Sequence, residues 1–157
     1  MKHTISALVE NQPGVLARIV GLISGRSYNI ESLNVGPTQD PSISRMTIVV
    51  PGDDRVLEQV TKQLNKLVDV IKVIDLTSQS HVSKEVVLIK VSAGKARRSE
   101  VLELVRVYGG EVVSMGAKSL IVEMIDGEGR ISELLEMLKP YGIADLSRSG
   151  MTAISKD

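Results

Sequence analysis

The chain has 157 residues, of which 43% are hydrophobic, and it contains no cysteine, tryptophan or phenylalanine. Its 19 basic and 19 acidic side chains balance overall, with 8 of each in residues 1–80 and 11 of each in residues 81–157. Nucleic acids and anionic membrane surfaces are bound by clustered Lys and Arg, so neither is an expected partner. Without cysteine there is no disulfide framework or thiol chemistry. With no signal-peptide or membrane-spanning apolar run, we expect a soluble, cytoplasmic protein with an aliphatic core.

The chain begins with a strand, a turn and a helix. Residues 3–10 alternate between apolar and polar side chains, which predicts a strand. Asn11-Gln12-Pro13-Gly14 has Pro and Gly at the two central positions of a type II turn. Apolar residues recur at helical spacing over 15–23, and Gly25 is a suitable stop. A second strand is expected over 28–35.

The first half closes with a hairpin and a second helix. Residues 36–41 contain two prolines, which favour a hairpin loop over a continued strand. Residues 45–50 predict the third strand, and Asp53 or Asp54 is suited to cap the helix that follows. Residues 68–77 predict a fourth strand. The order of elements is therefore βαββαβ.

The second half repeats this order, although few residues are identical between the halves. The expected elements are strand 84–92, helix 96–108, strands 110–115 and 118–126, helix 129–139 and strand 142–150. We predict an α+β protein with two ferredoxin-like βαββαβ domains in tandem, over residues 1–77 and 84–157, joined by the polar linker 78–83. Helices cover only one face of such a sheet, so the other face or an edge needs a partner. We therefore expect the chain to form at least a dimer.

The sequence offers little for catalysis. His3 and His81 fall at a strand start and in the linker, without a second histidine at metal-ligand spacing, and are expected to be solvated. Asp126-Gly127-Glu128-Gly129 lacks the Lys and Ser or Thr of a phosphate loop and predicts a turn into a helix. An RNA-binding version of the fold would need aromatic platforms on its strands, and the chain has only three tyrosines. We predict no catalytic residue and no metal site.

The densest positive run is Lys95-Ala96-Arg97-Arg98. A solvated surface patch with the nearby Glu100 and Glu103 explains it, and a docking surface for an acidic partner is the alternative. The sequence assigns no role to Lys95, Arg97 or Arg98.

The best candidate binding site surrounds the first helix. Asn11 offers an amide, Gly14 allows close approach to the backbone, and the free amides of the helix start suit a carboxylate. Such residues would suit a small apolar amino acid, although turn and cap formation also explain Asn11 and Gly14. The candidate residues are Asn11, Gly14, Val15 and Leu16 at the start of the helix, and Asn29 and Ile30 after its end.

Four sequence blocks carry a family resemblance. They are Asn11-x-Pro-Gly-Val-Leu-x-Arg-Ile, Tyr28-Asn-Ile-Glu-Ser-Leu33, Ser44-Arg-Met-Thr-Ile-Val49 and Gln63-Leu-x-Lys-Leu-Val68. Together, in this order, they resemble the small regulatory subunit of acetolactate synthase. The match spans residues 2–77; the second half matches more loosely, through its length, Glu85-Val-Val-Leu-Ile-Lys-Val91 and Arg148-Ser-Gly150.

The resemblance implies that the first domain is an ACT domain and that the chain is not itself an enzyme. It implies a subunit that binds the large catalytic subunit, raises its activity and confers feedback inhibition by valine. Thiamine diphosphate, magnesium and FAD would belong to the catalytic partner, and no cofactor to this chain. Valine would lie at an interface between two ACT domains of a homodimer. Asn11, Gly14, Val15 and Leu16 of one chain would hold it, and Asn29 and Ile30 of the other would complete the site.

Two other functions remain open from the sequence. A free-standing amino-acid sensor would bind valine but act on another partner. A small ferredoxin-like enzyme such as an acylphosphatase would turn over substrate without a partner. It would require an arginine in the loop after the first strand, and Asn11-Gln12-Pro13-Gly14 lacks one.

Overall fold

The computed structural model describes all residues from 1 to 157, and the chain divides into two compact units. The first unit consists of Met1–Val82 together with Met151–Asp157, and the second of Ser83–Gly150. Each unit has its own hydrophobic core.

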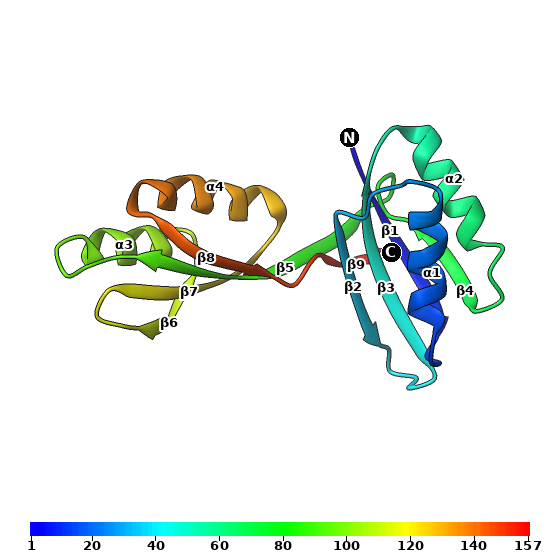
Figure 1. Cartoon of the computed structure of the whole chain (residues 1–157), viewed down its shortest axis with the longest axis horizontal. Helices are drawn as coiled ribbons and strands as arrows, with labels where there is room; N and C mark the ends of the chain where they lie inside the picture. The colour runs from blue at the N-terminus through cyan, green and yellow to red at the C-terminus, as the bar shows by residue number, and fades with distance from the viewer. The chain divides into compact units, whose positions relative to one another are not determined.

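The first unit has the predicted βαββαβ order. Its elements are β1 (Lys2–Glu10), α1 (Val15–Gly25), β2 (Ser32–Pro37), β3 (Ile43–Pro51), α2 (Asp54–Leu64) and β4 (Val70–Asp75). The strands form an antiparallel sheet in the order β2-β3-β1-β4, which leaves β2 and β4 at the edges. Figure 1 shows α1 and α2 on the same face of this sheet. This is the ferredoxin-like arrangement that the sequence predicts.

The core of the first unit is aliphatic because the strand and helix periods bring apolar side chains to one layer. Ile5, Ala7 and Val9 alternate along β1 and are buried against Ile19 and Ile23 of α1. The second helix starts where expected: the carboxylate of the N-cap residue Asp53 accepts a hydrogen bond from the amide of Val56 at 3.1 Å. Such a cap satisfies an amide that the helix itself cannot.

The second unit repeats the fold. Its elements are β5 (His81–Ser92, which starts in the first unit), α3 (Arg98–Val107), β6 (Glu111–Met115), β7 (Ser119–Asp126), α4 (Glu128–Leu138), a short 3₁₀ turn (Lys139–Tyr141) and β8 (Ile143–Arg148). The strand order is β6-β7-β5-β8, and α3 and α4 lie on one face of the sheet (Figure 1). The tandem α+β fold is therefore confirmed.

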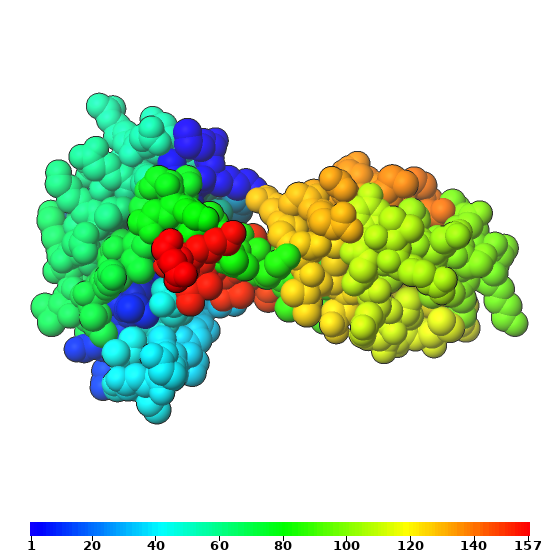
Figure 2. Space-filling model, turned by 180° about the vertical axis from the view of Figure 1, so that it is seen from behind, coloured from blue at the N-terminus to red at the C-terminus, as the bar shows by residue number.

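The end of the chain differs from the expectation. The predicted strand 142–150 ends at Arg148, and a further strand, β9 (Thr152–Ser155), pairs with β5. The amide of Lys156 donates to the carbonyl of Ser80 at 2.9 Å, and Met151–Asp157 belong to the first unit. Figure 2 shows these residues on the surface of that unit. The expected linker 78–83 overlaps the start of β5.

Two local predictions need correction. The second strand begins at Ser32 rather than at Tyr28, because residues 26–31 form the connection that follows α1. His3 is completely buried rather than solvated. Its Nε2 lies 3.1 Å from the carbonyl oxygen of Gly52 and 3.0 Å from that of Asp53, so the ring ties β1 to the turn before α2.

Candidate functional site

The start of α1 has an open helix terminus. Gly14 is the N-cap residue, with φ +85° and ψ −10°, the conformation of the third residue of a type II turn. The amide of Val15 donates to the carbonyl of Gln12 at 3.3 Å, which closes the predicted turn. No side chain caps the helix. The first-turn amides that follow Val15 are therefore oriented to receive an acceptor from outside the helix.

Asn11 holds this turn against the hairpin loop between β2 and β3. Its backbone amide donates to the carbonyl of Ser42 at 2.8 Å, and its Nδ2 donates to the carbonyl of Pro41 at 2.9 Å. The loop is itself braced, because the hydroxyl and the amide of Ser42 both donate to Asp40 and lower the pKa of that carboxyl. Asn11 thus has the turn-forming role that its residue type allows, and its side-chain oxygen remains for another donor.

An ion pair that the sequence analysis did not identify lies beside Gly14. The Nε of Arg18 donates to a carboxylate oxygen of Asp69 at 2.7 Å, which raises the pKa of Arg18. A Cβ built on Gly14 would lie 3.0 Å from Nη1 of the same guanidinium. Arg18 stands four residues after Gly14, so helical periodicity could have placed it on this side of α1.

The two apolar candidates at the helix start behave differently. The side chain of Val15, one of the predicted ligand-binding residues, is buried in the core of the first unit. Leu16 is 45% exposed and can serve as an apolar wall for a ligand. The backbone amide of Val15 already donates to the carbonyl of Gln12 at 3.3 Å.

Asn29 and Ile30 lie in the connection after α1. Asn29 is exposed, and Ile30 packs partly against the core. The eleven residues of α1 span about 16 Å, which separates these two residues from Asn11 and Gly14 within one chain. Within one chain, the candidates at the start of α1 therefore lie together, and Asn29 and Ile30 lie apart from them.

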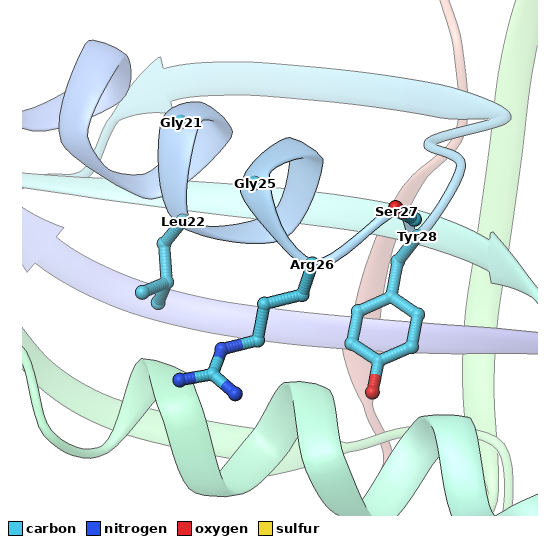
Figure 3. A pocket seen from close by; sticks show the side chains of 6 residues that line it. All are labelled: Gly21, Leu22, Gly25, Arg26, Ser27 and Tyr28. Atoms are coloured by element: carbon cyan, nitrogen blue, oxygen red, sulfur yellow. The ribbon is translucent and has the colours of Figure 1, made fainter.

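A shallow cleft of about 670 Å³ lies at the C-terminal end of α1. Figure 3 shows the side chains of Leu22, Arg26 and Tyr28 extending to the same side of the helix, next to the backbone of Gly21 and Gly25. None of the predicted site residues lines this cleft.

The basic run of the second unit is mostly used within that unit. Nη2 of Arg98 donates to the carbonyls of Ala93 and Ala117, at 3.2 and 3.4 Å, and to that of Gly116. It thereby ties the start of α3 to the turn between β6 and β7. The guanidinium of Arg97 lies 4.2 Å from the centre of the Tyr141 ring. Arg97 is nevertheless exposed and pairs with Glu100 at 3.9 Å, as the expected solvated patch requires, so only Arg98 departs from that expectation.

The structure contains no cluster of three or more His, Asp or Glu residues able to hold a metal ion. None of its helices combines the length and the apolar composition that crossing a membrane requires.

The fold and the turn at the start of α1 are those of an ACT-domain protein. Residues 5–72 match the family model of the AHAS small subunit-like ACT domain, and residues 84–157 match that of the small subunit of acetolactate synthase.

Similar proteins agree with both family models. A probable acetolactate synthase small subunit from Archaeoglobus fulgidus is 48% identical over 154 residues, covering 98% of this chain and 96% of that protein. The acetolactate synthase small subunit from Mycobacterium bovis is 47% identical over 154 residues, covering 98% and 92%. The crystal structure of the acetolactate synthase small subunit from Thermotoga maritima superposes with a TM-score of 0.89 at 31% identity, covering 100% and 98%. The chain belongs to the family of acetolactate synthase small subunits.

Proposed function

We propose that this chain activates the large catalytic subunit of acetolactate synthase and makes it sensitive to inhibition by valine. The observation that carries this proposal is the uncapped start of α1, held by Asn11 and Gly14, in a chain of this family. A ligand carboxylate accepts hydrogen bonds from first-turn amides and is favoured by the positive end of the helix dipole. Leu16 then provides an apolar surface for a branched side chain.

The proposed site is completed by a second copy of the chain. Asn29 and Ile30 follow the far end of α1 and do not reach a ligand at Gly14 of the same chain, but the corresponding residues of a second ACT domain can do so. The edge strand β2 supports this pairing, because its outer backbone groups have no partner within the sheet and its Val35 is exposed. Valine bound between two ACT domains would favour one arrangement of the homodimer. If that arrangement supports the catalytic subunit less well, valine lowers the activity.

Reconstitution tests this function. The purified chain should show no acetolactate synthase activity alone, should raise the activity of the large subunit when mixed with it, and should make that activity sensitive to valine. A free-standing sensor would bind valine without raising the activity of the large subunit. Catalysis by the isolated chain would contradict the proposal.

A further inference from the structure

A groove on the second unit has the chemistry of a docking site. It runs along the outer side of the helix pair α3 and α4 and has a volume of about 410 Å³. Three carboxylates line it, those of Glu100, Glu103 and Glu136, and no lysine or arginine does. Between them lie Leu104 and Tyr141, both partly buried against the core.

The rim of this groove exposes large apolar side chains. Val107, at the end of α3, is 70% exposed, and Met137 of α4 is 47% exposed. Neither belongs to the core, which α3 and α4 supply through residues such as Val105 and Leu134. The groove thus combines accessible apolar surface with three carboxylates, a combination that α3 and α4 do not need for their own packing.

The three carboxylates differ in their partners. Glu136 pairs with Lys139 at 2.7 Å. Glu100 accepts a hydrogen bond from the hydroxyl of Tyr141 at 3.0 Å and pairs with Arg97 at 3.9 Å. Glu103 forms no ion pair within the structure. A cation from outside can therefore approach Glu103 without displacing an internal partner.

We propose that this groove binds a cationic segment of the large catalytic subunit, in which lysine or arginine flanks an aliphatic side chain. The carboxylate of Glu103, which no internal cation neutralises, favours a basic segment, and the apolar floor and rim favour an aliphatic residue beside the charge. A second copy that presented the same groove would bring the two Glu103 carboxylates together, and these like charges would repel. The proposal rests on the proposed function, since that function supplies the large subunit as the partner.

The test measures the dissociation constant between the full chain and its large subunit for two matched sets of variants. Glu103→Lys reverses the charge of the groove, and the double variant Val107→Gln with Met137→Gln removes its apolar rim. Glu111→Lys is the control, because it makes the same charge change at an exposed position of β6. We expect Glu103→Lys to raise the dissociation constant on the order of tenfold, with a weaker dependence on salt than the wild type shows.

The rim variant should weaken binding without changing the salt dependence, and the control should bind like the wild type. Because the exchanged side chains are exposed, circular dichroism and thermal melting should match the wild type. If both groove variants bind as tightly as the wild type, and the wild type binds and activates the large subunit, the groove is not the docking site. The proposed function would then be unaffected. Variants that change only the oligomeric state of the isolated chain would show a self-interface and also overturn the groove as the docking site. A wild-type chain that does not bind the large subunit would contradict the proposed function itself.

Discussion

Gly14 tests the assignment of the valine site at the scale of one residue. An aspartate here would place bulk and negative charge where the carboxylate of valine is proposed to bind, and its Cβ would lie within 3.0 Å of Nη1 of Arg18. We expect Gly14→Asp to raise the valine concentration for half-inhibition at least about tenfold, equivalent to 1.4 kcal/mol. The measurement is a valine titration of the reconstituted enzyme.

The matched control for this substitution is Gly14→Ala. With φ at +85°, alanine shares the backbone strain of aspartate, on the order of 1 kcal/mol, but brings no charge. It should lose some stability and keep much more of its sensitivity to valine than Gly14→Asp does. If Gly14→Asp is inhibited like the wild type, the valine site lies elsewhere.

The surroundings of single residues were predictable only in part from the sequence. The glycine of the turn before α1 was identifiable because Pro-Gly suits a type II turn, and the observed φ agrees. The burial of His3 could not be predicted, because it depends on contacts with Gly52 and Asp53, which lie some fifty residues later in the chain. The contacts of Arg98 could not be predicted either, because nothing in the basic run indicates which side chain donates to the carbonyls of a distant turn.

At the scale of secondary-structure elements, Asp126 connects two strands and a helix. Its carboxylate accepts hydrogen bonds from Lys84 of β5 at 2.9 Å, from the amide of Gly127 at 2.7 Å and from Arg130 of α4 at 3.1 Å. The hydrogen bond from Lys84 is the main cause that lowers the pKa of Asp126 below its ordinary value of 3.8, and the amide of Gly127 follows. The end of β7 and the start of α4 are held by this one carboxylate.

A lowered pKa in the folded state gives this contact a defined pH dependence. The stabilisation is fully present above the unfolded-state pKa, near 3.8, and is lost as the pH falls through the folded-state value. Urea unfolding from pH 6 to pH 2.5 should therefore show a stability difference between wild type and Asp126→Asn that shrinks at the acid end. A constant difference for Asp126→Asn would contradict this account.

Element order was the most predictable level, because the periods of strands and helices repeat over many residues. All eight strands and four helices expected from the sequence are present, with ends displaced by a few residues. The strand β9 was missed because it has only four residues and follows a glycine with φ +81° at position 150, so its pattern is too short to stand out. The proposed site shows a different limit: its two groups of residues lie at opposite ends of α1, and a single chain cannot show which surfaces of two copies meet.

At the scale of the whole molecule, the question is to which of the two units the last seven residues belong. The sequence placed them in a domain of residues 84–157, whereas the structure groups Met151–Asp157 with the first unit. Ala153 is only 4% exposed and Ile154 is 57% exposed, as expected for a strand with one buried face. We therefore predict that truncation after Gly150 destabilises the first unit, on the order of 2 kcal/mol from lost hydrogen bonds and burial, and leaves the second unit unchanged.

Hydrogen exchange followed by mass spectrometry distinguishes the two units in one experiment. The truncated chain should exchange faster in β1 and β3, while β7 and α4 keep their protection. Two point variants give a matched pair for the same question: Ala153→Glu places a charge on the buried face of β9 and should act like the truncation, whereas Ile154→Glu places it on the exposed face and should have little effect. Faster exchange confined to the second unit would show instead that the C-terminal residues belong to the domain in which the sequence placed them. That result would also make residues 1–77 sufficient for the proposed ACT domain, because the first sheet would then need nothing from the end of the chain.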